Sequence, residues 1–429
     1  MRKLIVASAQ QQMRLFDSLD SYRKELKRFL YMARAKGAQL IAFPGLAGVM
    51  AATPLVEGFR INLLRQATDR RQGRGLWRRT RSAVAGGTAA LLGANFRKAF
   101  IQLLETDPGS LLRAYETTFS ELAEAYQLII VAGSAYLPDA NGVLRHQAVV
   151  FGPDGTVLGR HNKLTLGPED KGLAVAGDAW TVVTTPLARI GILLGEEALY
   201  PEAGRILAYQ GAEILVALAA TSGEALAAHV RQAMIARAQE NQCFGLTSFL
   251  VGRNYLAADE SLGESFVGKS GIYAPLEMTP RYSGVLVEMG TGGSEGLLTA
   301  ELDRDQLRTL WQSSAEPVRS RMPVDLFARY LPALYSSRRT LAETWPDLEV
   351  VERPPILPER PAVTLELPAS REQAQPLIGE AGPGAPAGPE AVAEHPSTVE
   401  EAQATSDRPP ADEQPPAQEE RPEVPSEKS

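Results

Sequence analysis

A stretch with the composition of an active site lies near the middle of the chain, at residues 191–218. It reads GILLGEEALYPEAGRILAYQGAEILVAL, and in it an apolar run ends at Gly195 and is followed by two acids, Glu196 and Glu197. Two carboxylates in different environments can carry out acid–base chemistry. Side chains alternate along a strand end, however, so these two are expected to point to opposite sides and not to form a working pair.

Few other residues have the chemistry of a nucleophile. Cys243 is the only cysteine, and its place before an apolar run is typical of a buried core thiol. Thr221 and Ser222 end the apolar run ILVALAA, but a hydroxyl nucleophile needs a base, and the nearest histidine in sequence is His229, eight residues on. We therefore do not expect a serine or threonine mechanism.

The sequence gives no sign of a metal centre, a cofactor or a membrane span. His146 and His161 have no other metal-ligating residue types in a suitable pattern around them, and one cysteine excludes both a disulfide framework and a cysteine-based metal site. No run reaches the roughly 18 apolar residues of a membrane span, and the apolar stretch after the first residues is too short for a signal peptide. These observations lead us to expect no cofactor, no metal and a soluble cytoplasmic protein.

Alternating strands and helices are expected to position these residues. Apolar runs predict the strands, and helical spacing of apolar residues predicts the helices. A β-hairpin is expected over 145–163, turning at Pro153, Asp154 and Gly155. Mixed sheets covered by helices follow from this order, in one domain over 1–315. The expected strands are 3–10, 39–45, 128–137, 188–195, 212–220, 244–252, 268–276 and 283–290, and the expected helices are 17–38, 111–127, 202–210, 226–242 and 303–314.

A basic insertion interrupts this pattern at about residues 51–108. Between Phe59 and Lys98 there are ten Arg or Lys residues and one acid, Asp69, with apolar residues among them. Such a segment is able to lie on a membrane surface or to bind an anionic partner, and the simpler interpretation is a solvated flap over a pocket. The apolar residues are Trp77, Leu91, Leu92, Phe96 and Phe100.

The C-terminal part has a different composition. A C-terminal extension at 316–352 is followed by 353–429, and from Glu352 onward there are 16 acidic and 6 basic residues, a net charge of −10 in a chain whose total is −7. The last 79 residues hold 16 of the 30 prolines and no aromatic residue. This composition predicts a disordered acidic tail, acting as a spacer or as a recruiter of partners.

Five segments in order resemble the carbon–nitrogen hydrolase, or nitrilase, superfamily. They are AKGAQLIAFPG, HNKLTLGPED, the stretch from Gly191 described above, ARAQENQCFGLTSFLVG and GKSGIYAPL. The resemblance covers residues 1 to about 310 without the basic insertion. It implies an α/β fold built as a four-layer α-β-β-α sandwich, usually as a homodimer.

The resemblance also implies a chemistry that this sequence does not fully carry. In the family a glutamate accepts the thiol proton, a cysteine attacks the C–N carbon, and a lysine stabilises the oxyanion. Here Gly45 stands in the place of the glutamate and Gly195 in the place of the cysteine, while the lysine is retained as Lys163. Glycine has no side chain, so neither position is able to attack or to take a proton.

The retained lysine is the candidate ligand-binding residue. A buried ammonium needs a counter-charge, and we expect Glu169, with Asp170 as the alternative, or Glu197 to supply it. Two other interpretations stay open: a pocket that binds an anionic small molecule through Lys163, and an ordinary half-exposed loop lysine.

The sequence thus leads to three hypotheses about function. The first is a nitrilase-fold protein that has lost amide hydrolysis and acts as a binding or scaffolding protein. The second is a divergent amidohydrolase with an unconventional nucleophile, in which Lys163 still stabilises the oxyanion. The third is a membrane-surface protein attached through residues 59–100, a segment that is equally able to bind a protein partner. A homodimer is expected, and a nucleic-acid partner is not.

Overall fold

The computed structural model describes residues 3–56, 96–257, 265–314 and 318–336. Within these ranges the strands form one 14-stranded sheet that folds over on itself. Its central path runs β4-β5-β3-β2-β1-β10-β9-β8-β7. The two halves are joined only where β1 pairs with β10 in parallel, at Gln11 with Leu250 and at Gln12 with Val251.

The first half of the sheet contains the N-terminal strand at its centre. β1 lies parallel to β2, and β2 lies parallel to β3. β14 pairs antiparallel with β1 along eight positions, from Lys3 opposite Asp303 to Gln10 opposite Gly296. The strands of this half are β1 (Lys3–Gln12), β2 (Leu40–Ala42), β3 (Ile129–Val131), β4 (Ala135–Pro138), β5 (Leu144–Phe151), β6 (Val157–Asn162) and β14 (Gly296–Asp303).

The second half is built around three parallel strands. β8 pairs with β9 and β9 with β10, and short antiparallel strands flank them. The strands are β7 (Val183–Thr184), β8 (Arg189–Leu194), β9 (Ile214–Ala219), β10 (Phe244–Arg253), β11 (Ser265–Phe266), β12 (Gly271–Tyr273) and β13 (Val285–Glu288).

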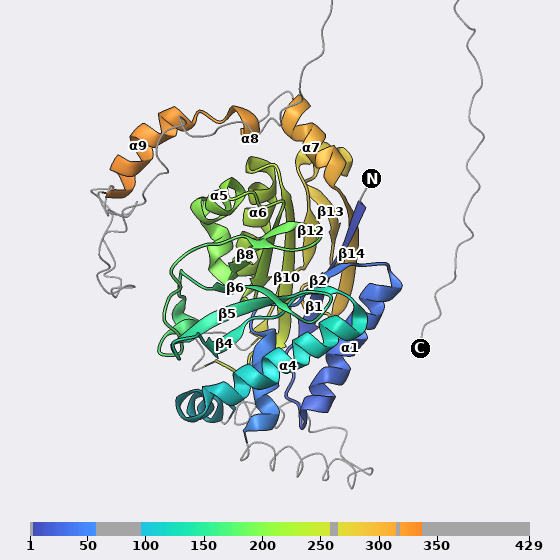
Figure 1. The fold of residues 1–429 in the computed structure, drawn as a ribbon, viewed down its shortest axis with the longest axis vertical. Coiled ribbons are helices and arrows are strands. Elements are labelled where there is room, and N and C mark those ends of the chain that lie inside the picture. Colours follow the sequence, from blue (N-terminus) through green and yellow to red (C-terminus); the bar gives the residue numbers. More distant parts are fainter. Residues whose placement is uncertain (1–2, 57–95, 258–264, 315–317, 337–429) are drawn as a thin grey trace, which may run out of the picture. The chain divides into compact units, whose positions relative to one another are not determined.

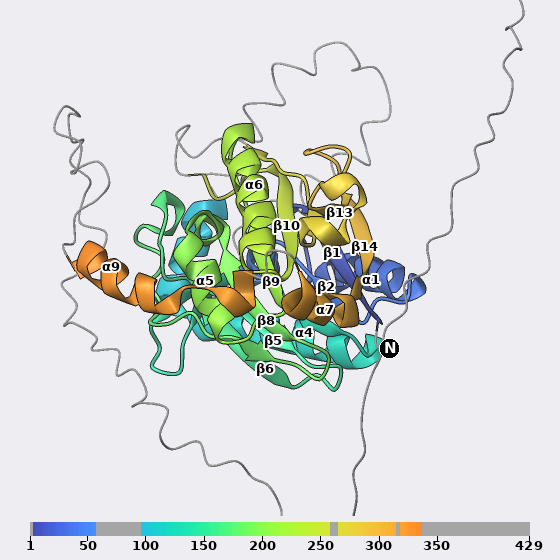
Figure 2. The ribbon, with the colours of Figure 1, turned by 90° about the horizontal axis from the view of Figure 1, so that it is seen from above.

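Helices cover the outer face of each half (Figure 1, Figure 2). Helices α1 (Leu19–Ala35) and α4 (Pro108–Tyr126) pack on the first half, and α5 (Pro201–Tyr209) and α6 (Glu224–Glu240) pack on the second. Helix α7 (Arg304–Ser313) follows β14, and α8 (Val318–Arg321) and α9 (Val324–Ser336) come after it. Short 3₁₀ turns complete the described elements: η1 (Ala47–Leu55), η2 (Pro168–Asp170), η3 (Gly195–Leu199), η5 (Leu276–Met278) and η6 (Pro280–Tyr282).

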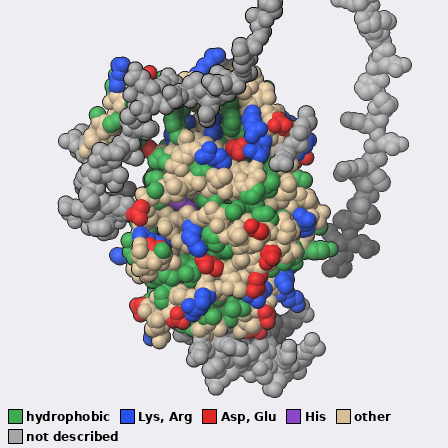
Figure 3. Space-filling model, viewed as in Figure 1, with side chains coloured by type: hydrophobic (Ala, Val, Ile, Leu, Met, Phe, Trp, Pro, Cys, Tyr) green, Lys and Arg blue, Asp and Glu red, His purple; other side chains and the backbone are tan. Residues whose placement is uncertain are grey.

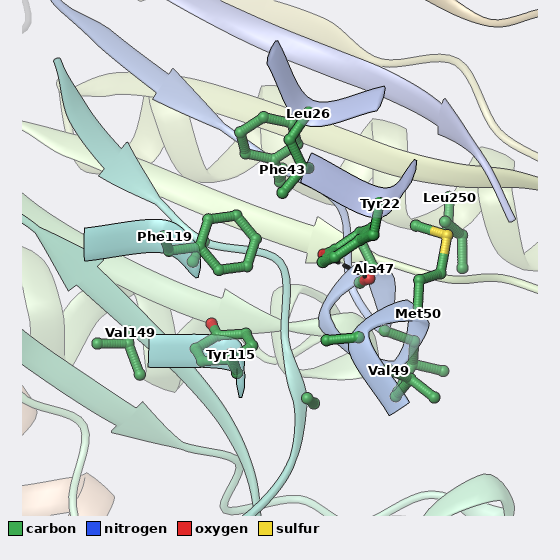
Figure 4. Close-up of a cluster of buried hydrophobic side chains, with 14 of the residues drawn as sticks. Tyr22, Leu26, Phe43, Ala47, Val49, Met50, Tyr115, Phe119, Val149 and Leu250 are labelled. Atoms are coloured by element: carbon green, nitrogen blue, oxygen red, sulfur yellow. Dashed lines mark hydrogen bonds between the residues drawn. The ribbon is translucent and has the colours of Figure 1, made fainter. Parts of the chain in front are cut away.

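Three layers of buried apolar side chains separate the four layers of backbone. The middle one lies between the two halves of the sheet, where Val6 from β1 faces residues such as Ile192 and Val216 from the second half. The outer ones lie under α1 and α4 and under α5 and α6. Figure 4 shows the first outer layer, where the Tyr22 hydroxyl donates to the carbonyl of Ala47 at 3.2 Å. The α-β-β-α sandwich implied by the resemblance is confirmed.

Local signals explain why α1 forms where the sequence predicts it. Ser18 caps its N-terminus by accepting a hydrogen bond from the backbone N–H of Ser21. Its apolar residues fall at helical spacing and are fully buried against the sheet, among them Leu26 and Phe29. Gly37, with φ +75°, lets the chain leave the helix in a left-handed turn.

Two of the differences from the sequence predictions concern the core. Strand β14 was not predicted, because its adjacent residues Leu297 and Leu298 break the alternation of apolar and polar residues that indicates a half-buried strand. Phe96 and Phe100, which the sequence analysis places in the basic insertion, are fully buried in a helical segment at 96–106, and the ring centroids of Phe100 and Tyr136 are 6.1 Å apart. The end of the insertion therefore belongs to the core. Residues 57–95 and the acidic tail lie outside the described residues.

Candidate functional site

Lys163 is the centre of a buried charge cluster. It follows β6, and its backbone N–H donates to the carbonyl of His146 at 2.8 Å. Its side chain is 1% exposed, which rules out the interpretation of a half-exposed loop lysine. The ammonium lies 2.8 Å from Glu169 Oε1, 2.7 Å from Asp170 Oδ2 and 2.9 Å from Glu196 Oε2. Three carboxylates thus share one ammonium, which offsets the cost of burying it.

These charges set the protonation states of the cluster. Burial alone would lower the pKa of Lys163, but the carboxylates of Asp170, Glu169 and Glu196 outweigh it and raise the pKa above its ordinary value. The ammonium therefore stays protonated near neutral pH and is unable to act as a base or an amine nucleophile. It remains suited to hold a negative charge in place.

The two neighbouring acids of η2 are shifted in opposite directions. Burial raises the pKa of Glu169 above its ordinary value, and the nearby carboxylates of Glu196 and Asp170 add to the rise against the effect of Lys163. Burial also acts to raise the pKa of Asp170, but His146 and Lys163 outweigh it and hold the pKa below its ordinary range. Asp170 is thus the fixed anion of the cluster, and Glu169 is the acid that takes up a proton more readily.

A chain of hydrogen bonds links Asp170 to the loop after β2. His146 Nδ1 lies 2.7 Å from Asp170 Oδ1, and His146 Nε2 lies 2.7 Å from the hydroxyl of Ser134. That hydroxyl accepts a hydrogen bond from the backbone N–H of Leu46 at 2.8 Å. These partners are all satisfied if Nδ1 carries the imidazole proton and Ser134 donates to Nε2.

Ser134, His146 and Asp170 therefore have the connectivity of a serine–histidine–aspartate triad. Ser134 is fully buried, however, and its oxygen is occupied by Leu46 N–H, so a substrate has no access to it. The arrangement orients Asp170 and the loop that carries Gly45. No sequence pattern indicates this arrangement, because it depends on the pairing of β4 with β5, in which Tyr136 lies opposite His146. The Tyr136 O–H also donates to Asp170 at 3.1 Å.

Glu197 does not belong to the Lys163 cluster, which corrects one of the two expectations for its counter-charge. Its carboxylate lies 2.7 Å from His161 Nε2 and accepts hydrogen bonds from the backbone N–H groups of Leu164 and Leu194, both at 2.8 Å. Burial acts to raise the pKa of Glu197, but His161 and these N–H groups hold it below its ordinary value. Glu197 therefore ties the segment after β6 to the end of β8.

Glu196 and Glu197 do not form a pair with each other, because each contacts a different partner. Both belong to the 3₁₀ turn η3 and not to a strand end, so the alternation expected from the sequence does not apply. Glu196 turns to Lys163, which sequence reasoning did not assign to it, and Glu197 turns to His161.

Gly195 lies directly beside the ammonium. Its φ is +57°, in the left-handed region, and a Cβ placed on it would lie 3.6 Å from Lys163 Nζ with no tighter contact. Gly45 is different, because a Cβ there would lie 2.8 Å from the carbonyl oxygen of Leu218 and 3.1 Å from the carbonyl carbon of Ala219. A side chain fits at Gly195 but not at Gly45 without a backbone shift.

A cavity of about 180 Å³ lies next to this cluster and is lined by two of its carboxylates, Glu169 and Glu196, but not by Lys163 itself. Its polar walls are formed by Glu169 and Glu196 together with Tyr136, Ser222 and Asn254. This volume holds a molecule of a few non-hydrogen atoms, well below the roughly 300–1,000 Å³ of pockets for drug-sized ligands. The apolar wall consists of Leu46, Pro168, Leu173, Ala220, Leu226, Leu256 and Phe266.

The other candidate nucleophiles are not poised for attack. Cys243 is fully buried, burial raises the pKa of its thiol to about 12, and its Sγ contacts the carbonyl of Arg237, as predicted for a core thiol. Thr221 is buried and donates to the carbonyl of Val267. Ser222 lines the cavity, where Asn254 Nδ2 lies 3.5 Å from its oxygen, and His229 is exposed on α6.

No group of three or more His, Cys, Asp or Glu side chains within the described ranges is arranged to hold a metal ion. A search of the same residues found no helix with the length and apolar character of a membrane span.

Comparison with known proteins identifies the family. The sequence model of the carbon-nitrogen hydrolase family matches residues 5–312. This chain belongs to the carbon-nitrogen hydrolase family. The resemblance seen in the sequence is thereby confirmed.

Curated members of the carbon-nitrogen hydrolase family share about a quarter to a third of the aligned residues. The chain is 29% identical over 197 residues to a probable hydrolase of Bacillus subtilis, a match that covers 45% of this chain and 37% of that protein. It is 28% identical over 217 residues to an omega-amidase of Bos taurus, covering 48% of this chain and 72% of that protein. The chain thus matches well under two thirds of the first relative's length.

Solved structures of the same family share the fold. A carbon-nitrogen hydrolase from Helicobacter pylori has a TM-score of 0.56 and 19% identity, covering 77% of this chain and 98% of that one. A mutant amidase from Nesterenkonia sp. AN1, which carries a covalent adduct at its active-site cysteine, has a TM-score of 0.52 and 18% identity, covering 76% and 96%. At identities of 18% and 19%, the structural comparison shows that the fold is shared and nothing about the activity.

Replacement of Asp170 by Asn should destabilise the protein, because it removes the anion held between Lys163 and His146. Breaking a buried charge pair costs roughly 3–5 kcal/mol, and two carboxylates remain on Lys163, so we expect a loss of about 3 kcal/mol in the free energy of unfolding at pH 7. Urea denaturation measures this loss.

The effect of Asp170→Asn should also depend on pH. The pKa of Asp170 is depressed in the folded state, so its contribution is fully present above the unfolded pKa of about 3.9 and is lost as the pH falls below it. The difference between wild type and variant should therefore shrink towards pH 3. Asp20→Asn, in the exposed first turn of α1, is the control and should stay within about 0.5 kcal/mol of wild type. An equal and pH-independent loss in both variants would contradict the assignment.

Gly195→Cys should place a thiol within reach of the ammonium and make it reactive. A nearby cation lowers a thiol pKa, and the left-handed backbone costs roughly 1–2 kcal/mol, which a folded domain tolerates. We expect iodoacetamide at pH 7 to add one adduct to the variant and none to wild type, whose only thiol is buried, as read by mass spectrometry. Adding Lys163→Met should slow the reaction about tenfold. A thiol that reacts no faster than a cysteine peptide would contradict activation by Lys163 and show that the three carboxylates cancel its charge at position 195.

Proposed function

We propose that this member of the carbon-nitrogen hydrolase family does not carry out cysteine-dependent amide hydrolysis and acts as a binding protein, with the cavity next to the Lys163 cluster as its ligand site. The single observation that carries the proposal is Gly195 beside the ammonium. The nucleophile's position is in place, its charged neighbour is in place, and the reacting atom is missing.

Gly45 supports the loss of the general base. A side chain there would run into the carbonyl of Leu218 at the end of β9, so the backbone itself has closed over the space that a glutamate would need. Restoring that acid would require the loop after β2 to move. The change is thus built into the packing of two elements and is not a single exchanged side chain.

The charge of the cluster supports one class of ligand. Glu169 and Glu196 both line the cavity while sharing one ammonium with Asp170, so the site carries more acidic than basic groups. Such a surface favours a ligand that donates hydrogen bonds or carries positive charge, a small primary amine or amide. It argues against the anionic ligand that the sequence left open, since the ammonium is already neutralised.

One observation favours a second candidate, a hydrolase whose nucleophile is water. Glu169 lines the cavity and is hydrogen-bonded to Lys163, and its raised pKa makes it a better proton acceptor than an ordinary glutamate. In this candidate Glu169 accepts a proton from a water molecule that attacks the carbonyl carbon of an amide. Lys163 stabilises the oxyanion, and the proton passes to the leaving amine.

A homodimer is proposed through the surface formed by α5 and α9. Tyr209 on α5 is 61% exposed and Tyr330 on α9 is 67% exposed. The other large apolar side chains exposed on these two helices are Ile206, Val324, Leu326, Phe327, Leu331, Leu334 and Tyr335. The two helices are neighbours, because Tyr335 of α9 hydrogen-bonds to Glu202 of α5. An apolar surface on two adjacent helices supports burial by a second copy.

The membrane-surface hypothesis rests mainly on residues outside the described ranges, and the burial of Phe96 and Phe100 removes part of its support.

Pure protein should release no ammonia from a panel of simple amides, nitriles and N-carbamoyl compounds, since no described thiol or hydroxyl at the cavity is activated. In a separate thermal denaturation experiment, small amines and amides should raise the melting temperature of the protein, and small carboxylates should not. A ligand at 100 times its Kd adds about 2.7 kcal/mol to the free energy of unfolding.

Matched variants separate the two candidate functions. Glu196→Gln should weaken ligand binding, and Glu105→Gln, an exposed acid on the 96–106 helix, should leave it unchanged. Ammonia release that disappears in both Lys163→Met and Glu169→Gln would overturn the binding proposal and support water-based hydrolysis. The binding proposal is refuted if neither amines nor carboxylates shift the melting temperature and the protein releases no ammonia.

The full chain should be a dimer by size-exclusion chromatography with light scattering. Stable interfaces bury about 1,200–2,000 Å² in total, and introducing a buried charge should disrupt one. Tyr330→Asp and Ile206→Asp should therefore give monomers. Tyr31→Asp, at a residue 69% exposed on α1, is the matched control and should stay dimeric. A monomeric wild type would contradict the proposed interface.

A further inference from the structure

A second pocket lies at the opposite end of β8 from Gly195. It has a volume of about 490 Å³ and is formed by the turn before β8, the loop before β9, and helices α7 and α8. We call it the arginine pocket. It is lined by Thr185, Pro186, Leu187, Ala188, Arg189, Gly211, Glu213, Arg304, Arg308, Trp311 and Arg319.

The arginine pocket is lined by more positive than negative side chains. Four guanidinium groups line it with one carboxylate, that of Glu213. Arg304 already occupies that carboxylate, with Nη2 2.6 Å from Oε1 and 2.8 Å from Oε2. Arg308 lies 3.7 Å from Glu213 and 3.8 Å from Asp305 of its own helix, and its side chain is 54% exposed. The carboxylates therefore compensate Arg304 fully and Arg308 only weakly.

Arg319 is held in place at the wall of the pocket. Its Nη atoms donate to the carbonyls of Ala208, Ala212 and Asn241, and its guanidinium lies 4.3 Å over the ring of Trp311. Burial lowers the pKa of Arg319, and the neighbouring charges of Arg205 and Arg189 lower it further, although Glu213 acts in the other direction. A guanidinium remains charged despite such a shift, so the pocket keeps this positive charge.

Arg189 supplies a cation with no anionic partner. Within the described residues its side chain forms no ion pair, and it lies over Gly211, where an added Cβ would be 2.7 Å from Arg189 Nη1. The φ of +90° at Gly211 favours glycine. Within the described residues, the N–H donors of the Arg189 side chain are free, in a pocket that Arg308 and Arg319 also line.

We propose that the arginine pocket binds a small molecule that carries a phosphate group. Guanidinium groups form paired hydrogen bonds with phosphate oxygens. Arg189 and Arg308 line the pocket and would contact the phosphate directly, while the charge of Arg319, whose Nη atoms are held by carbonyls, adds to the attraction. The volume leaves space for more than the phosphate, which points to a phosphate monoester. Lys and Arg side chains gather near α7 on the face of the molecule shown in Figure 3. This proposal is independent of the function proposed for the Lys163 cavity.

Trp311 provides the reporter for a direct test with the full-length protein. Its fluorescence is followed during titration with inorganic phosphate, glucose 6-phosphate and adenosine monophosphate at constant ionic strength, with chloride as the reference salt. Saturable binding with a Kd below about 1 mM is expected for at least one monoester. Tighter binding of inorganic phosphate than of either monoester would show that the pocket recognises the free ion and would overturn the monoester assignment.

Variants decide whether the binding is specific to the pocket. Arg189→Ala and Arg308→Ala remove exposed side chains, so they should fold normally and raise the Kd at least about tenfold. Arg113→Ala, at a side chain 72% exposed on α4, removes the same charge elsewhere and should leave the Kd unchanged. Titration calorimetry repeats the measurement without relying on Trp311. An equal loss in all three variants would show general screening of charge, and the absence of saturable binding by both methods would refute the proposal.

Discussion

The burial of one ammonium group organises the centre of this protein. The charged end of Lys163 is buried between apolar layers, and a charge buried there must be paired with anions at hydrogen-bond distance. Glu169 and Asp170 come from the segment after β6 in the first half of the sheet, whereas Glu196 comes from the turn after β8 in the second half. The cluster is therefore an electrostatic link between two halves whose strands pair directly only at the end of β1. Glu197 forms a parallel link through His161.

This constraint gives Lys163 a structural role that does not depend on catalysis. Removing the lysine would leave three carboxylates close together in a buried site, and removing Asp170 would leave His146 and Tyr136 without their shared partner. Each change costs stability whether or not the protein is an enzyme. Gly195 and Gly45 have no side chains, so they contribute neither a charge nor a side-chain hydrogen bond to this cluster.

The two ends of β8 have opposite electrostatic character. After its last residue, Leu194, the chain enters the acid-rich cavity next to the Lys163 cluster, and at its first residue, Arg189, it borders the arginine pocket. Six strand residues span roughly 20 Å, about two Debye lengths at physiological ionic strength. Charge at one end therefore has little influence on ligand affinity at the other, and the two sites can serve ligands of opposite charge independently.

The sequence by itself determined the family, the layer order and the identity of the central lysine. Apolar runs and helical spacing located α1, α4, α6 and most of the strands, since burial of one face imposes a period that is visible in the chain. The same patterns did not predict β14, which pairs with a strand far away in the sequence. They also did not predict the burial of Phe96 and Phe100, because these residues lie in a segment with the composition of an exposed basic insertion.

Only the tertiary structure decided which acids contact Lys163. Glu196 and Glu197 are adjacent and identical in type, and one 3₁₀ turn sends the first to Lys163 and the second to His161, because neighbouring side chains on a turn point in different directions. The arginine pocket was likewise invisible in the sequence, because its four guanidinium groups come from three segments that only the folded chain brings together.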